Sequence, residues 1–158
     1  WQCGTLQVDF VLPERLNAVY IGSDGGKYRP VMLHRAVLGS FERFIGILLE
    51  NYSGRLPVWL CPIQIAIASI SENSISFAKE IDNILKKNHF KSKLDIRNEK
   101  LSFKIRELTL EKVPFIGIIG DKESKNKKVT LRVHGEKEQT EISVDELLKK
   151  LKNSCSKR

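Results

Sequence analysis

The chain has 158 residues, of which 41% are hydrophobic and 29% are charged, an ordinary composition for a soluble globular protein. No run approaches the roughly 18 apolar residues of a membrane span, and the N-terminus lacks a signal-peptide pattern. The three cysteines are far apart and form no Cys-x-x-Cys pair, which excludes a disulfide framework and a zinc knuckle. We therefore expect a soluble cytoplasmic protein without membrane association.

The net charge of +8 is concentrated in the second part of the chain. Residues 1–60 carry 6 basic and 5 acidic side chains, net +1, whereas the remainder carries 21 and 14, net +7. A basic module is typical of a nucleic-acid partner, because lysine and arginine neutralise phosphates. A lysine-rich solvated surface without such a partner would explain the same excess.

The first part of the chain is predicted to be mainly antiparallel sheet. The first residue, Trp1, leads directly into a strand pattern, so we interpret the chain as a fragment of a longer protein. Apolar and polar residues alternate over residues 5–12, which predicts a strand that Pro13 ends. A strand resumes at 15–22, a glycine-rich hairpin turn follows at 23–30, and the next strand covers 31–39.

A helix capped by Ser40 is predicted next, and it runs to about Gly54. Its apolar residues recur at helical spacing and predict a face that packs on a sheet: Phe41, Phe44, Ile45 and Leu48. The proline-punctuated segment that follows indicates a domain boundary. We therefore divide the chain into a first domain at 1–56, a linker at 57–62 and a second domain at 63–158.

Strands and helices alternate in the second domain, which predicts an α/β fold. Strands are expected at 63–70, 91–96, 114–120, 127–133 and 139–143, and helices at 72–88, 102–112 and from Ser143, where Glu146 completes a capping box. The last helix presents Val144, Leu147, Leu148 and Leu151. The sheet should be mixed, mostly parallel, flanked by helices and closed by an antiparallel hairpin. Residues 121–128 are predicted to form a charged loop.

Two residues near the first helix suggest chemistry. Arg43 lies close to the helix N-terminus, which favours anions, so it is a candidate phosphate ligand, although an ion pair with a nearby carboxylate fits equally well. His34 lies in a strand next to apolar residues, where a structural side chain is the commoner explanation.

In the second domain, residues 95–100 and 120–123 follow the carboxyl ends of predicted parallel strands, where ligands of open α/β sheets bind. Asn98 could pair with a base edge, Glu123 could accept from amino groups, and Arg132 could stack. Polar loop tips without a ligand explain the pattern about as well.

The wording of six segments resembles the C-terminal portion of threonyl-tRNA synthetases along essentially the whole chain. They are "WQCGTLQVDF", "LPERL", "RPVMLHRAVLGSFERFIGILLENYSG", "LPVWLCPIQ", "RNEKLSFKIRE" and "VPFIGIIGDKE". The resemblance implies the end of a class II synthetase catalytic domain on an antiparallel sheet, followed by an α/β anticodon-binding domain. It also implies zinc as cofactor and threonine, tRNA(Thr) and ATP with magnesium as partners or substrates, in a homodimer.

The same resemblance assigns roles to residues of the first domain. "GSFER" resembles motif 3, so Arg43 would bind ATP, packing on the adenine and facing the phosphates. His34 matches a zinc ligand, with a Cys and a second His expected upstream and Cys3 not a substitute. The remaining matches would line the aminoacyl-adenylate pocket: Gln2, Thr5, Gln7 and Ser40.

In the second domain the resemblance implies that four residues read the threonine anticodon: Asn98, Lys100, Glu123 and Arg132. Three positions depart from the family pattern. Ser102 stands where glycine is frequent, and Glu111 stands where a basic residue is common. Cys61 replaces a frequent alanine, a change that we expect to be structural.

The expected activity of the parent protein is threonine–tRNA ligation, and the fragment alone is expected to be inactive. A stand-alone, non-catalytic RNA-binding protein with a synthetase-like fold is the main alternative, against which His34, Arg43 and Gln2 argue. A small α/β enzyme is a weaker one, because no nucleophile and base pair is evident.

Overall fold

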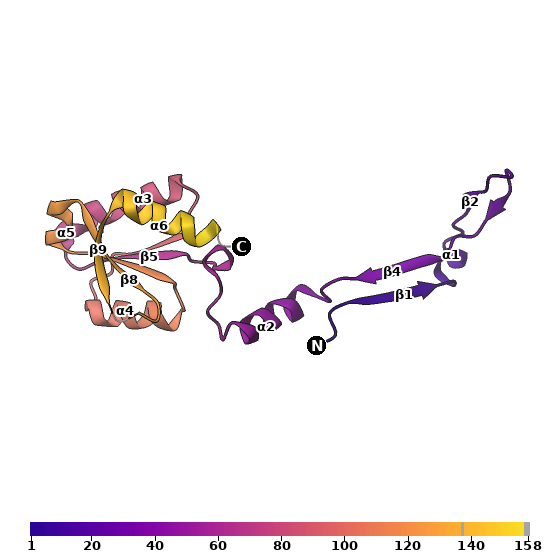
Figure 1. The fold of residues 1–158 in the computed structure, drawn as a ribbon, viewed down its shortest axis with the longest axis horizontal. Coiled ribbons are helices and arrows are strands. Elements are labelled where there is room, and N and C mark those ends of the chain that lie inside the picture. The colour runs from indigo at the N-terminus through magenta and orange to yellow at the C-terminus, as the bar shows by residue number, and fades with distance from the viewer. Residues whose placement is uncertain (137, 157–158) are drawn as a thin grey trace. The chain divides into compact units, whose positions relative to one another are not determined.

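Two antiparallel strand pairs and two helices make up Trp1–Ser53, the first of two units into which the chain divides (Figure 1). The computed structural model describes residues 1–136 and 138–156. In the first unit β1 (Thr5–Asp9) pairs with β4 (Met32–Ala36), and β2 (Tyr20–Ile21) pairs with β3 (Lys27–Tyr28). The helices are α1 (Leu12–Arg15) and α2 (Phe41–Asn51).

The first strand ends earlier than its sequence pattern predicts. Asp9 Oδ1 accepts hydrogen bonds from the N–H groups of Val11 at 2.8 Å and Leu12 at 2.9 Å. These bonds turn the chain into α1, so β1 stops at Asp9 rather than at Leu12. A hairpin turn is present as predicted but is shorter, because Lys27–Tyr28 within the predicted turn form β3, and Gly25 adopts the left-handed conformation with φ of +77°.

Helix α2 begins as predicted, because the Ser40 hydroxyl accepts a hydrogen bond from the Arg43 N–H at 3.2 Å. The expectation that this helix packs on a sheet is wrong for this chain. None of the α2 residues, all of which the structure describes, is buried, and Phe41 is 83% exposed. Two-stranded ladders are too small to bury a helix face, and Pro13 alone is buried among residues 1–53.

A five-stranded mixed sheet forms the centre of the second unit, Gly54–Arg158, with the strand order β6-β5-β7-β8-β9. Its strands are β5 (Ile65–Ser69), β6 (Ser92–Asp95), β7 (Phe115–Ile119), β8 (Lys128–Val133) and β9 (Gln139–Ser143). β5 is parallel to β6 and β7, and the β8–β9 hairpin adds antiparallel strands at one side. The predicted mixed sheet, closed by an antiparallel hairpin, is confirmed, although only two of its four strand pairings are parallel rather than most of them.

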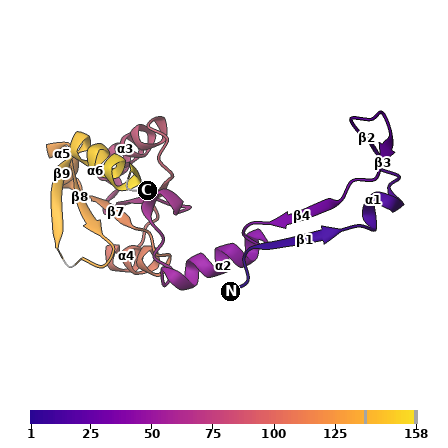
Figure 2. The same ribbon diagram turned by 45° about the vertical axis from the view of Figure 1, so that its right-hand side comes forward.

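Helices cover both faces of this sheet (Figures 1 and 2). α3 (Ile75–Lys87) and α6 (Val144–Ser156) bury their apolar faces on one side, and α4 (Leu101–Leu110) covers part of the other. Short 3-10 turns η1 (Val58–Leu60) and η2 (Glu72–Ser74) precede β5 and α3. Because side chains alternate along a strand, β5 and β7 contribute to both hydrophobic clusters.

The segment predicted as a charged loop at 121–128 instead contains a short helix, α5 (Asp121–Asn126). The Glu123 carboxylate accepts a hydrogen bond from the Gly120 N–H at 3.0 Å and thereby caps the helix start. The prediction failed because this helix has no apolar periodicity and depends on its cap. Across the described ranges, no helix is long and apolar enough to cross a membrane.

Candidate functional site

The β1–β4 ladder places three of the predicted pocket residues on one face. Its register sets Gln7 opposite His34 and Thr5 opposite Ala36. Directly opposed residues share a face, and so do residues two apart on one strand. Thr5, Gln7 and His34 therefore form an exposed polar row along this face.

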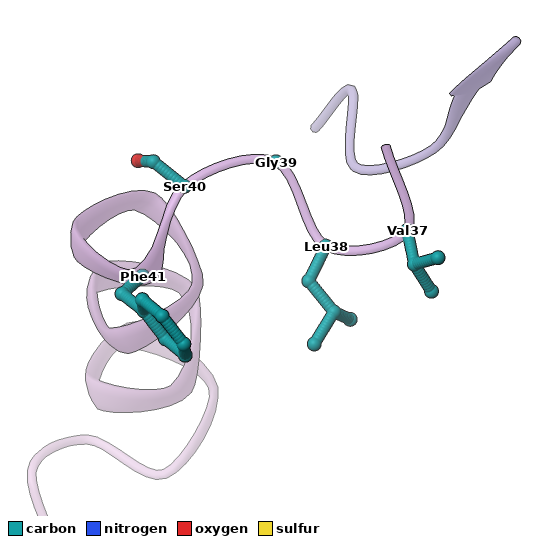
Figure 3. Close-up of a pocket in the computed structure, with 5 residues that line it drawn as sticks. All are labelled: Val37, Leu38, Gly39, Ser40 and Phe41. Carbon is teal, nitrogen blue, oxygen red and sulfur yellow. The ribbon is translucent and has the colours of Figure 1, made fainter. Parts of the chain in front are cut away.

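The row leads to the loop between β4 and α2, whose residues 37–41, Ser40 among them, line a small pocket (Figure 3). Arg43 Nη1 donates a hydrogen bond to the Gln2 carbonyl at 3.3 Å, and the Ser40 hydroxyl caps the same helix turn. Gly39 has φ of +74°, and a Cβ there would lie 3.5 Å from Arg43 Cδ. The structure thus brings Gln2, Ser40 and Arg43 together at the end of the ladder where Thr5 lies.

His34 has a carboxylate partner that the sequence pattern does not reveal. Its Nε2 lies 3.0 Å from Asp9 Oδ2, on the same face of the ladder. The pKa of Asp9 is lowered, first by the Leu12 N–H and then by His34. A carboxylate on one ring nitrogen fixes the tautomer of a metal-binding histidine and leaves its other nitrogen for the metal.

His34 therefore fits the role of one zinc ligand, with Nδ1 free of the contact to Asp9. A structural or catalytic zinc site needs at least two more protein ligands. Within the part of the chain that the structure describes, no group of three His, Cys, Asp or Glu side chains could hold a metal ion. The donor chemistry of His34 fits zinc, but residues 1–136 and 138–156 place no complete set of three ligands around it.

The second candidate site lies at the carboxyl edge of the parallel strands, as the sequence predicts. β6 ends at Asp95 and β7 ends at Ile119, and both run parallel to β5 between them. The loops that carry Asn98 and Lys100 and that lead to Glu123 therefore leave the sheet at one edge. Asn98 lines a small pocket there, together with Ser69, Ile70, Ser71, Glu72, Ile75, Ile96 and Arg97.

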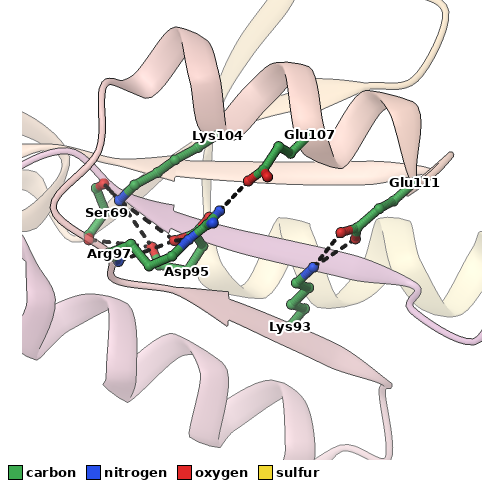
Figure 4. A network of polar contacts seen from close by, with 7 residues as sticks. All are labelled: Ser69, Lys93, Asp95, Arg97, Lys104, Glu107 and Glu111. Atoms are coloured by element: carbon green, nitrogen blue, oxygen red, sulfur yellow. Dashed lines mark hydrogen bonds and ion pairs between the residues drawn. The ribbon is translucent and has the colours of Figure 1, made fainter.

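A network of charges with a buried centre lies beside this edge (Figure 4). The Asp95 side chain is 2% exposed, and its two oxygens accept hydrogen bonds from Arg97 Nε at 3.0 Å and Nη2 at 2.7 Å. Arg97 lowers the pKa of Asp95, and burial opposes this effect. Arg97 also donates to Glu107 of α4. The loop after β6 is thus tied to both the sheet and the helix.

Lys104, on the buried face of α4, completes the network, and its side chain is 1% exposed. Its Nζ donates a hydrogen bond to the Ser69 carbonyl at 2.8 Å and lies 3.4 Å from the Asp95 carbonyl. The sequence interpretation missed this residue. The available signal was its place on the apolar stripe of the helix, beside Leu101, Ile105 and Leu108, where a lysine must be buried.

Glu123 is held by its own unit rather than left free at a loop tip. Its Oε1 accepts a hydrogen bond from the Thr130 hydroxyl at 2.9 Å. Burial raises the pKa of Glu123, but hydrogen bonds from its own backbone, Thr130 and Gly120 outweigh burial and lower it. The carboxylate is therefore ionised at neutral pH, and its oxygens can accept further hydrogen bonds.

Arg132 does not join the other three predicted residues at the carboxyl edge. The β7–β8 register sets Thr130 opposite Ile118 and Arg132 opposite Ile116, nearer the start of β7. Arg132 shares a face of β8 with Thr130 and so with the partner of Glu123. The structure thus gathers Asn98, Lys100 and Glu123 at one edge and places Arg132 on the adjoining hairpin face.

The three departures from the family pattern have distinct surroundings. Glu111 accepts from Lys93 Nζ with both oxygens at 2.7 Å, at the end of α4 away from residues 96–100. Ser102 is exposed on the first turn of α4. Cys61 is 4% exposed, and its thiol donates to the Leu56 carbonyl at 3.3 Å, a buried and structural place.

Residues 1–52 match the family model of the tRNA synthetase class II core domain (G, H, P, S and T), and residues 64–154 match the anticodon binding domain. The chain belongs to the anticodon-binding domain family, here joined to the end of a class II aminoacyl-tRNA synthetase core. Within this class its sequence matches threonyl-tRNA synthetases, which confirms the predicted resemblance.

The threonine–tRNA ligase of Orientia tsutsugamushi (strain Boryong) is 59% identical over 148 residues, which are 94% of this chain and 23% of that protein. The threonine–tRNA ligase of Caulobacter vibrioides (strain NA1000 / CB15N) is 53% identical over 156 residues, 99% of this chain and 24% of that protein. The RNA binding domain of threonyl-tRNA synthetase from Cryptosporidium parvum Iowa II is 38% identical, with a TM-score of 0.78, and covers 98% of this chain and 39% of that one. The chain spans about a quarter of the length of these curated relatives.

Proposed function

We propose that this chain is the anticodon-recognising part of a threonine–tRNA ligase, an enzyme that activates threonine with ATP and transfers it to tRNA(Thr). The observation that carries the proposal is the position of Asn98, Lys100 and Glu123 after the carboxyl ends of β6 and β7, in a chain that matches threonine–tRNA ligases. Single-stranded RNA loops present unstacked bases that such polar side chains can read. The excess of positive charge in this part of the chain would favour the phosphates.

Each of the four residues has a chemical role in this proposal. The Asn98 amide would pair with a base edge, because it both donates and accepts hydrogen bonds. Glu123 would accept from a base amino or imino group, and Lys100 would contact a phosphate. Arg132, on the adjoining hairpin face, would stack on a base or bind the backbone.

The first unit would contribute to the catalytic site of the complete enzyme. Arg43 would bind ATP and its magnesium-bound phosphates, because it lies at a helix N-terminus. The aminoacyl-adenylate pocket would be lined by Gln2, Thr5, Gln7 and Ser40. His34 would be one zinc ligand, oriented by Asp9. Zinc, when bound, would hold the amino and hydroxyl groups of threonine and reject valine, which lacks the hydroxyl.

We expect the isolated chain to catalyse no threonine-dependent ATP–pyrophosphate exchange. Among residues 1–53, all of which the structure describes, Pro13 alone is buried. The residues assigned to the catalytic site therefore have no packed core to hold them in place. The matched control is a full-length threonine–tRNA ligase assayed under the same conditions. Threonine-dependent turnover by the isolated chain would contradict this part of the proposal.

We expect the chain to discriminate between anticodons. An RNA stem–loop with a threonine anticodon should bind about tenfold more tightly than one with the anticodon bases replaced, the effect of losing about one base contact. The Asn98→Ala variant should lose most of this difference. The control variant Lys149→Ala should retain it. Lys149 is exposed on α6, which packs on the face of the sheet opposite to α4. Filter binding at fixed salt measures both affinities.

A stand-alone RNA-binding protein with the same folds is the competing function. It would show steep salt dependence with equal affinity for both stem–loops, because only phosphates would be contacted. Equal binding of the two RNAs would therefore favour the competing function. The synthetase proposal also implies a homodimeric parent protein in the cytoplasm, where tRNA is charged.

A further inference from the structure

The network of Asp95, Arg97 and Lys104, in which Asp95 and Lys104 are buried and Arg97 is half-exposed, adjoins the loop that carries Asn98 and Lys100. None of these three residues makes one of the proposed anticodon contacts. Asp95 is the last residue of β6, and Asn98 and Lys100 follow it in the same loop. Lys104 lies one helical turn after Lys100, on the buried side of α4. The network therefore bounds residues 96–100 on both sides.

Three elements meet through this network (Figure 4). Lys104 Nζ, from α4, donates to the Ser69 carbonyl at the end of β5 and lies close to the Asp95 carbonyl at the end of β6. Arg97, in the loop itself, is held by both oxygens of Asp95 and by Glu107 of α4. The loop is thereby fixed to two strands and to the helix that follows it.

Burial makes these contacts restrictive. An ammonium group that is nearly inaccessible to water must stay paired, because leaving it unpaired in a low-dielectric interior is costly. Any other position of the loop that moved Asp95 would take from Lys104 its carboxylate neighbour and the Asp95 carbonyl, and would leave it the Ser69 carbonyl. Fully satisfied buried polar networks of this kind select a single local conformation.

We propose that Lys104 is a positioning residue for anticodon recognition, which acts through Asp95 and Arg97 to hold Asn98 and Lys100 at the sheet edge. The proposal rests on the proposed function of the edge. Lys104 is buried and does not touch RNA itself. Its loss therefore affects how well the loop distinguishes bases, and affects general attraction to phosphates much less.

The test is the Lys104→Met variant in the 158-residue chain, since methionine fills a similar volume without donors. Filter binding gives its affinities for the two stem–loops, one with the threonine anticodon and one with the anticodon bases replaced. We expect the ratio of the two affinities to fall about tenfold, which corresponds to the loss of about one well-placed base contact. Affinity for the replaced anticodon should change less than twofold.

Lys93→Met is the matched control. Lys93 is a lysine of β6, and its Nζ pairs with Glu111 at the C-terminal end of α4, away from the loop. The same substitution there removes the same charge and also breaks an ion pair. We expect its affinity ratio to equal that of the unaltered chain.

A folded Lys104→Met variant with an unchanged ratio would overturn the inference and leave the proposed function standing. Equal binding of both RNAs by the unaltered chain would overturn both. If Lys104→Met does not fold, Arg97→Gln changes a half-exposed member of the same network, and circular dichroism checks its folding. That variant should lose the ratio as well, and retention of the full ratio would contradict the proposal.

Discussion

The second unit, produced alone as Gly54–Arg158, is expected to fold and to unfold cooperatively, whereas Trp1–Ser53 alone is expected to show no unfolding transition. All of the buried hydrophobic residues of the described chain lie between Cys61 and Leu151. Two clusters, one on each face of the sheet, provide the core of the second unit. A domain of this size is typically stable by about 5–15 kcal/mol.

The first unit has the opposite character. Its strands and helix expose large apolar side chains, among them Leu6, Val8, Leu33 and Phe41. A two-stranded ladder does not bury enough apolar surface to offset the entropy of ordering the chain. Its stability as part of a longer protein would come from surfaces outside residues 1–53.

Urea titration followed by circular dichroism and tryptophan fluorescence measures both segments. The second unit contains Trp59, so its transition can be followed by both signals. Coincident transitions in Gly54–Arg158 and a linear response in Trp1–Ser53 are the expected results. A cooperative transition of the isolated first segment would show that these strands form a core of their own and would weaken the prediction of inactivity.

The Asp95→Asn variant is expected to destabilise the second unit by about 3–5 kcal/mol, the cost of breaking a buried ion pair from one side. Asparagine has nearly the same shape as aspartate, so packing is preserved and the change is one of charge. It leaves Lys104, which is 1% exposed, without its anionic neighbour, and it weakens the paired contacts to Arg97. An uncompensated buried ammonium accounts for most of the expected loss.

Glu111→Gln is the control for this variant. It also neutralises a carboxylate that pairs with a lysine, because Glu111 at the end of α4 pairs with Lys93 of β6. Here, however, the side chains of Glu111 and Lys93 are 42% and 38% exposed. Exposed ion pairs contribute about 0–1 kcal/mol, so little change is expected. Urea titration of both variants gives the free energies of unfolding that are compared. Similar losses for Asp95→Asn and Glu111→Gln would show that the burial of the Asp95 network carries no special energetic weight.

Much of the second unit could be predicted from the sequence because its strands and helices have clear local sequence patterns. Alternating apolar runs, helical stripes and the Ser143–Glu146 capping box indicated the strands, the helices and the mixed sheet. The same order of elements indicated that the loops after β6 and β7 leave at one edge. The Ser40 cap of α2 was likewise evident, since a cap depends on residues three apart in the chain.

Other features depended on contacts between distant residues, and only the tertiary structure decided them. Helix α5 exists through the Glu123 cap and its tie to Thr130 rather than through any apolar period. Asp9 is a partner of His34 because the β1–β4 register brings together residues 25 positions apart. Such pairings follow from strand register, which a local pattern does not specify.

The wrong prediction for α2 and the failure to notice Lys104 have one physical cause. The apolar stripe of α2 predicted burial, but burial requires an opposing surface that residues 1–53 do not provide. Lys104 is charged, and charge predicts exposure, yet the ends of β5 and β6 present carbonyls and a carboxylate that hold it inside. The sequence by itself determined which segments become strands and helices. The tertiary structure decided which of their side chains meet a partner, because burial and ion pairing depend on surfaces that come from elsewhere in the chain.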